Sequence, residues 1–198
     1  MTTTADELAA HASRLARENE ALEDLTGLVA HEVKSALLRA LLDDEPAAGL
    51  TRALELVDTT LEVVRASHAD GGVVAVADVV RDALSDLGGV DASVTTTAAG
   101  GFPLPRPALR LVLRNLLANA VAAGASTIHV STLAGRARDV LVVDDDGVGL
   151  ESDGYATGER LGLALCRRLV ARSGGVIELK PRSPGGTRAV ITVSGADR

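Results

Sequence analysis

The stretch "VLVVDDDGVGL", residues 140 to 150, joins a run of Val and Leu to three aspartates and a glycine-rich turn. Such a run, bounded by turn residues, is typical of a buried strand. A carboxylate at a strand end can accept a hydrogen bond from an exocyclic amine while a glycine backbone lies flat against a ring. Asp145, Gly147 and Gly149 are therefore candidate binding residues, although Asp-Gly turns alone are common.

The segment before this strand, "RNLLANAVAAG" at residues 114 to 124, places Asn115 and Asn119 one turn apart on a predicted helix. Asparagine amides compete with the helix backbone for hydrogen bonds, so asparagine is unfavourable inside a helix. Two asparagines on the same face of one helix therefore suggest a function. Oxygen donors at this spacing can complete the shell of a magnesium ion that already holds phosphates and waters. The alternative is a helix end that hydrogen-bonds the sheet, which fits Asn115 better than Asn119.

Two glycine-containing segments follow the strand. "GERLGLALCRRLVARSGG", residues 158 to 175, begins a predicted helix at glycines, where free N–H groups and the helix dipole favour phosphate. "GGTRAV", residues 185 to 190, reads equally well as a plain hairpin turn. Each of these signals is weak by itself.

The pattern around these motifs predicts a domain over residues 73–198, preceded by a short linker at residues 70–72. We expect an α/β sandwich with helices on one face of a mostly antiparallel sheet. Residues 98–105 are predicted to form a loop. The predicted helices cover residues 76–87, 107–123 and 160–173, and the predicted strands cover 73–75, 90–97, 127–132, 139–144, 176–180 and 188–193.

The N-terminal residues 1–69 predict a different domain. Apolar residues recur every seven positions at Leu8, Leu15, Leu22, Val29 and Ala36, a pattern that indicates a packing seam along a helix. The loop "DDEPAAG" separates this helix from a second amphipathic helix. One helical hairpin cannot bury both apolar stripes, so we expect two chains to pair their hairpins into a four-helix bundle as a homodimer.

The segment "LVAHEVKSALLRALL", residues 28 to 42, carries His31 and Glu32 on this first helix. At about 100° per residue, His31 lies roughly 200° from both Val29 and Val33, on the side opposite the seam. Glu32 could bind one ring nitrogen and leave the other as an unprotonated nucleophile. A solvated histidine without a role is at least as common at such a position, and it is the interpretation we give to the remaining histidines.

Composition disfavours several other classes of function. The chain of 198 residues has 20 basic and 27 acidic residues, a net charge of −7, and only 1% aromatic residues, which disfavours nucleic acid as a partner. No apolar run is long enough to span a bilayer, and "MTTTADE" lacks the features of a signal peptide, so we expect a cytoplasmic protein. The single cysteine excludes an internal disulfide, and no zinc-ligand spacing occurs.

Taken in order, these motifs resemble the two-component histidine kinases from about Leu25 to Val193. "HEVKSAL" is similar to their phosphoacceptor segment, "NLLANA" to the asparagine box, and "DDDGVGL", "GERLGLAL" and "GGT" to the three glycine boxes. The joint match is far more specific than any single motif. It implies an α+β chain in which an antiparallel helical hairpin is followed by a Bergerat-type ATP-binding sandwich.

The resemblance also implies ATP, magnesium and a role for each motif residue. The γ-phosphoryl group is expected to pass to His31, assisted by Glu32, and then to an aspartate on the receiver domain of a response regulator. The nucleotide is expected to lie with adenine against Asp145 and the turn of Gly147 and Gly149, with Thr187 near the adenine, the phosphates at Gly158 and Gly162, and magnesium at Asn119 with help from Asn115.

The sequence departs from the pattern of these kinases at several positions. Ala36 replaces the usual proline, which predicts a straighter helix. Ser35 stands where Thr or Asn supports dephosphorylation of the regulator, Ala122 where a basic residue is common, and Arg160 where the second glycine box has a glycine. The segment "ESDGYATG" between the first two glycine boxes is short, which predicts weak retention of ATP and leaves turnover in question.

Two other functions fit part of this pattern. A histidine phosphotransferase relay protein would keep the hairpin histidine and have a degenerate ATP site. A serine kinase of the anti-sigma type would share the ATP-binding domain and would not need His31. No sensor precedes the hairpin in this sequence, so we expect either that the input signal comes from a separate sensor protein or that the sequence is part of a longer chain.

Overall fold

The computed structural model of the chain describes residues 72–98, 100–135, 138–149 and 161–194, with helical positions at 8–9, 11–13, 16, 34, 57, 61–62 and 66. The chain divides into two compact units, Met1–Thr60 and Leu61–Arg198. Most of the predicted hairpin, including His31 and Glu32, lies outside the described residues. The hairpin, its dimer and the linker at residues 70–72 therefore stay predictions.

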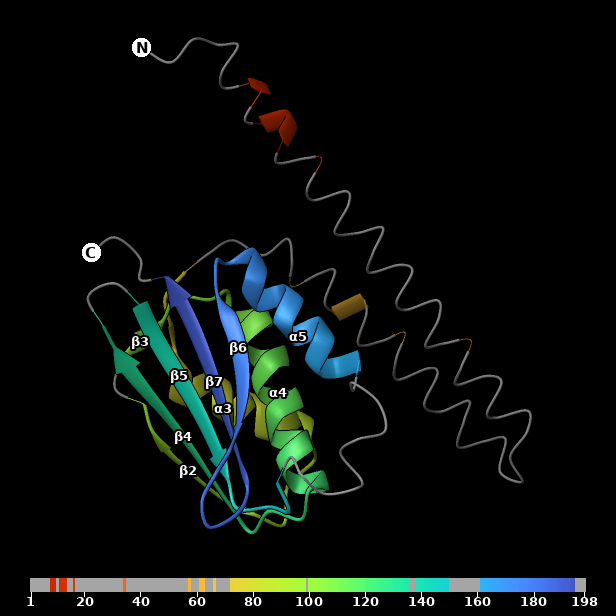
Figure 1. The fold of residues 1–198 in the computed structure, drawn as a ribbon, viewed down its shortest axis with the longest axis vertical. Helices are drawn as coiled ribbons and strands as arrows, with labels where there is room; N and C mark the ends of the chain where they lie inside the picture. The colour runs from red at the N-terminus through yellow and green to blue at the C-terminus, as the bar shows by residue number, and fades with distance from the viewer. Residues whose placement is uncertain are drawn as a thin grey trace. The chain divides into compact units, whose positions relative to one another are not determined.

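The second unit contains a five-stranded sheet with helices on one side (Figure 1). The strand order is β2-β4-β5-β7-β6, in which β2 runs parallel to β4 and every other neighbouring pair is antiparallel. A separate antiparallel pair joins β1 and β3. The strands are β1 (Val74–Ala75), β2 (Ser93–Thr97), β3 (Gly101–Phe102), β4 (Thr127–Ala134), β5 (Arg138–Asp145), β6 (Val176–Pro181) and β7 (Thr187–Ser194), and the helices are α3 (Val76–Asp86), α4 (Arg106–Ala122) and α5 (Leu161–Arg172).

The alternation of side chains along the strands creates one buried face of the sheet. In β5 and β7 every second residue is buried, as expected when one face packs on helices and the other faces solvent. The fully buried α4 residues Leu109, Val112, Leu113 and Leu117 recur at helical spacing and form the centre of the core. This packing fixes the ends of β5 and β7 beside the C-terminal half of α4, where the sequence motifs lie.

The structure confirms the predicted sandwich with helices on one face of a mostly antiparallel sheet. It differs from the prediction at residues 98–105, which were expected to be a loop throughout and contain β3. This short strand pairs with β1, and local sequence cannot reveal such a pairing. The strand expected from residue 90 begins at Ser93, because the turn that ends α3 occupies Leu87 and Gly88 and the chain bends again at residues 91–92.

Candidate functional site

The candidate site is formed where β5 ends and β7 begins. Asp145 is the last residue of β5, Thr187 is the first residue of β7, and both side chains are buried. Asp145 Oδ1 accepts hydrogen bonds from the backbone N–H of Gly147, at 2.9 Å, and from the backbone N–H of Thr187, at 3.1 Å. One carboxylate oxygen therefore joins the two strand ends.

The polar atoms at this point are not all satisfied by the protein. The hydroxyl oxygen of Thr187 is the buried side-chain polar atom without a hydrogen-bond partner among the described residues. Buried polar groups are nearly always paired, so an unpaired hydroxyl beside a carboxylate indicates space for a polar ligand. An exocyclic amine, which donates hydrogen bonds, fits this acceptor set.

Glycines allow the backbone to close around the carboxylate. A Cβ at Gly186, which has a φ of 97°, would collide with the carbonyl oxygen of Asp145. Gly147 approaches the end of α4, since a Cβ there would lie 2.8 Å from the carbonyl oxygen of Ala123. Gly149, at a φ of 79°, approaches the carbonyl of Gly186. The predicted turn residues Gly147 and Gly149 are thus brought together with Asp145 and Thr187.

Asn115 and Asn119 lie on α4 and contact each other and α5. The side-chain N–H of Asn119 donates to Asn115 Oδ1 at 3.3 Å, and the pair is partly buried. The first turn of α5 crosses this pair so closely that a Cβ at Gly162 would collide with the Asn115 amide. The helix-end alternative for Asn115 is wrong, because the residue lies inside α4 and its amide contacts Asn119 and α5.

The three consecutive aspartates have three separate roles. Asp144 projects from the sheet face away from the helices and accepts two hydrogen bonds from the Arg188 guanidinium, both at 2.7 Å. Asp145 occupies the buried site. Asp146 lies beyond the strand and accepts four hydrogen bonds, from the backbone N–H and hydroxyl groups of Ser126 and Thr127, at 2.7 to 2.8 Å.

Asp146 is the positioning residue that the sequence analysis missed. Its hydrogen bonds to Ser126 and Thr127, with the Thr127 backbone bond first, hold the pKa of the carboxyl well below its ordinary value of 3.8. The bonds join the turn after α4 to the turn after β5. They therefore fix the position of the Asp145–Gly147 backbone relative to the α4 end that carries Asn119.

The remaining predicted residues are placed as follows. His31, Glu32 and Gly158 lie outside the described residues. No group of three His, Cys, Asp or Glu side chains suited to a metal ion occurs in the described ranges. Among the helices that the structure describes, none has the length and apolar character needed to cross a membrane.

Comparison with known proteins finds a family that the domain resembles. Residues 105–196 match the family described as histidine kinase-, DNA gyrase B-, and HSP90-like ATPase, a range that runs from the start of α4 through β7. Residues 105–196 are therefore similar to that family. The resemblance to histidine kinases is confirmed for the domain, and the helical hairpin lies outside the match. No curated protein matches the chain significantly.

Solved structures show the same fold. The ATP-binding domain of PrrB from Mycobacterium tuberculosis has a TM-score of 0.54 and 28% identity, covering 64% of this chain and 98% of that one. The mycobacterial sensor histidine kinase MprB gives a TM-score of 0.53 and 20% identity, with coverages of 64% and 98%. The Acinetobacter baumannii histidine kinase AdeS gives a TM-score of 0.56 and 15% identity, with coverages of 87% and 96%. At their identities, the last two comparisons show the fold alone.

Proposed function

We propose that this chain is a histidine kinase core that binds ATP at the Asp145–Thr187 site and transfers its γ-phosphoryl group to His31. The observation that carries the proposal is the unpartnered Thr187 hydroxyl beside the buried Asp145 carboxylate. A buried acceptor pair of this kind suits the amine edge of adenine. The family match and the likeness to the ATP-binding domain of PrrB support the same ligand.

Each group of the site has a separate task in this proposal. Asp145 accepts the adenine amine through Oδ2, because Oδ1 is occupied by the backbone of Gly147 and Thr187. Asn119 and Asn115 offer amide oxygens to magnesium, which when bound neutralises charge on the phosphates. The Asp146 hydrogen bonds keep these two parts of the site in register.

The acceptor and the later steps are proposed from the sequence. A ring nitrogen of His31 forms the bond to phosphorus as the bond to the leaving ADP breaks, and Glu32 orients the imidazole through its other nitrogen. Two copies pair through their hairpins, and a response regulator receives the phosphoryl group on an aspartate.

The experiment is phosphoryl transfer from radiolabelled magnesium-ATP to the full chain. We expect label that is acid-labile, that His31→Gln removes and that the control His11→Gln retains. Label that survives His31→Gln in an acid-stable form on a partner would indicate a serine kinase instead. Absence of ATP binding, together with uptake of label from a phosphorylated regulator, would indicate a relay protein.

A further inference from the structure

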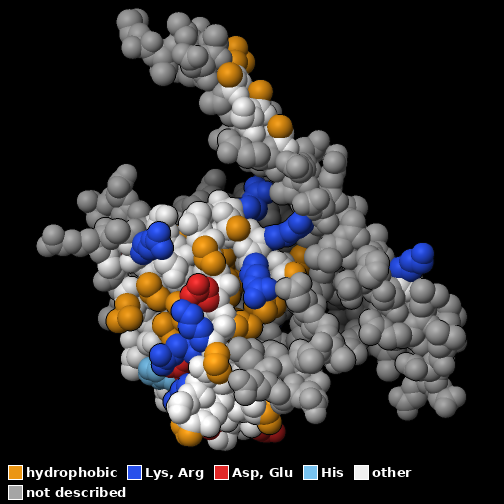
Figure 2. Space-filling view, viewed as in Figure 1, with side chains coloured by type: hydrophobic (Ala, Val, Ile, Leu, Met, Phe, Trp, Pro, Cys, Tyr) orange, Lys and Arg blue, Asp and Glu red, His pale blue; other side chains and the backbone are white. Residues whose placement is uncertain are grey.

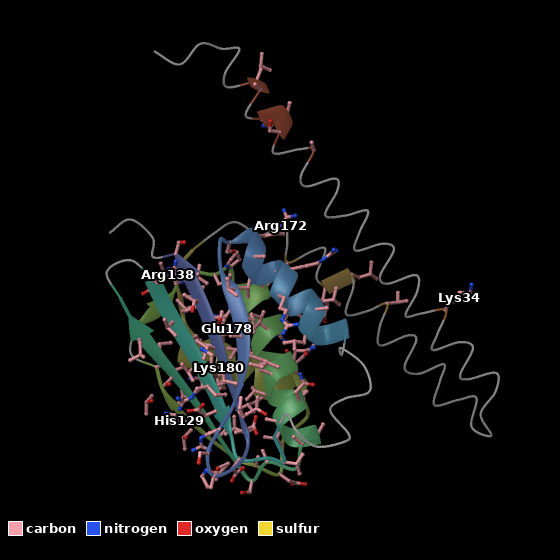
Figure 3. All side chains as sticks on the ribbon, viewed as in Figure 1. Lys34, His129, Arg138, Arg172, Glu178 and Lys180 are labelled. Carbon is pink, nitrogen blue, oxygen red and sulfur yellow. The ribbon has the colours of Figure 1, made fainter. Side chains whose placement is uncertain are left out.

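The face of the sheet away from the helices carries three rows of side chains, which we call the open face. The strand register places the members of each row side by side across β4, β5, β7 and β6. Figure 3 labels His129 on β4 and Glu178 and Lys180 on β6, at the two sides of this face. The rows are His129, Asp144, Arg188 and Lys180; Ser131, Val142, Val190 and Glu178; and Leu133, Val140, Thr192 and Val176.

The open face is more apolar than a solvated sheet face needs to be. The two central strands contribute the half-buried Val140, Val142 and Val190. The outer strands contribute Leu133, which is 66% exposed, and Val176, which is 58% exposed. Figure 2 shows hydrophobic and basic side chains next to one another on this side of the domain. An antiparallel sheet with one solvated face usually alternates to polar residues there, so a continuous apolar area indicates a contact surface.

The arrangement is complementary to itself. Consider a twofold axis that runs along the strands between β5 and β7 and brings a second sheet face to face with the first. Such an axis exchanges β5 with β7 and β4 with β6, and it leaves each row in place. It sets Asp144 over Arg188, Val142 over Val190, Val140 over Thr192, Leu133 over Val176, Ser131 over Glu178 and His129 over Lys180.

Three of these pairs match in chemistry as well as in position: Asp144 with Arg188, Val142 with Val190, and Leu133 with Val176. The carboxylate of Asp144 meets the guanidinium of Arg188 twice, once on each side of the axis. The two most exposed apolar residues of the face are Leu133 on β4 and Val176 on β6. In the paired sheets each lies over the other, at the outer strands of the contact. Sheets that pack face to face keep their strands within about 30° of each other, so the match holds best for the pairs beside the axis.

We propose that the open face is a contact surface for a second copy of this chain, paired through this twofold axis. The pairing leaves the Asp145–Thr187 site uncovered, because Asp145 and Thr187 point to the opposite face of the sheet. Four strands spaced by about 4.8 Å and three rows spaced by about 6.8 Å give an area of roughly 400 Å² per copy. A standard interface has about 800 Å² per partner, so the contact is weak by itself and is best detected by covalent trapping. The proposal does not depend on the proposed kinase function.

The test uses two full-length variants, Val142→Cys and Val190→Cys, produced together and oxidised with copper phenanthroline. Each new cysteine lies over the other in a mixed pair, and inter-sheet disulfides have the reach that this requires. We expect a covalent dimer from the mixture and loss of that band when either variant is oxidised alone. The native Cys166 is buried and does not interfere.

The control is a mixture of Val190→Cys with Val121→Cys, whose cysteine lies on α4 away from the open face. The proposal is overturned if the Val142→Cys and Val190→Cys mixture gives no more covalent dimer than this control. It is also overturned if the single variants form the dimer as well as the mixture does.

A second measurement separates pairing from local stability. Asp144→Arg added to both cysteine variants places arginine over arginine, and we expect the covalent dimer to decrease severalfold. Asp144→Arg on the Val142→Cys chain with Arg188→Asp on the Val190→Cys chain restores opposite charges across the axis. Both combinations break the ion pair within each chain, so recovery of the dimer in the second alone supports the interface, and equal yields would refute it.

Discussion

Replacing Asp145 by Asn and by Ala separates the two tasks of this carboxylate. Its Oδ1 accepts two buried backbone hydrogen bonds, from Gly147 and Thr187, whereas Oδ2 is the acceptor proposed for the adenine amine. In Asp145→Asn the amide oxygen can keep both backbone bonds, but its N–H group then opposes the amine. In Asp145→Ala both backbone N–H groups lose their partner.

The expected magnitudes follow from these contacts. A hydrogen bond to a charged group contributes about 1.5–3 kcal/mol, so Asp145→Asn should weaken ATP binding by about 10- to 150-fold with little change in Tm. Each buried N–H group without a partner costs about 1–3 kcal/mol, so Asp145→Ala should lose about 2–6 kcal/mol of stability. That loss corresponds to a fall in Tm of about 5–25 °C for a chain of this size.

Calorimetric titration with magnesium-ATP and thermal unfolding followed by circular dichroism measure the two effects on the same preparations. The reasoning is refuted if Asp145→Asn binds ATP as tightly as the parent chain. It is equally refuted if Asp145→Ala unfolds at the same temperature as Asp145→Asn, since the structure gives the two substitutions different hydrogen bonds.

Three further predictions concern other parts of the domain. Gly162→Ala should push the Asn115 amide aside and lower ATP affinity in a calorimetric titration, whereas unchanged affinity would contradict the role given to Asn115 beside α5. Because the pKa of Asp146 is depressed on folding, the stability it provides is present above the unfolded value near 3.8 and is lost as pH falls below it. The Tm difference between the parent chain and Asp146→Asn should therefore shrink from pH 5 to pH 2 in a series of thermal melts, and a constant difference would contradict this. Burial raises the pKa of Cys166 to about 12, so a thiol reagent at pH 8 should react only after unfolding, and rapid modification of the folded chain would argue against the buried position.

Much of the domain could be predicted because its local patterns agree with its packing. The helix expected at residues 107–123 is α4, Arg106–Ala122, since apolar residues at helical spacing lie between a proline-rich start and a glycine at residue 124. The run of Val and Leu at residues 140–143 similarly predicted a strand, which is β5. Residues 101–102 were missed because β3 exists only through its pairing with β1.

The candidate site was predicted in part. Asp145, Gly147, Gly149 and Thr187 come together as expected, because strand ends in neighbouring positions of one sheet meet at one edge. The role of Asp146 could not be read from the sequence, since its partners Ser126 and Thr127 lie in another turn. The sequence also could not show why residue 162 is a glycine. That requirement comes from the close approach of α5 to the Asn115 side chain.

The most direct test of the account compares magnesium-ATP with magnesium-GTP in a titration of the full chain. The central claim is that the Asp145 carboxylate and the Thr187 hydroxyl form an acceptor site for a purine amine. Guanine carries a carbonyl oxygen where adenine carries that amine, so GTP should bind about tenfold more weakly or worse, as expected for one lost hydrogen bond to a charged group. GTP binding as tight as ATP binding, or no binding of ATP, would contradict the claim.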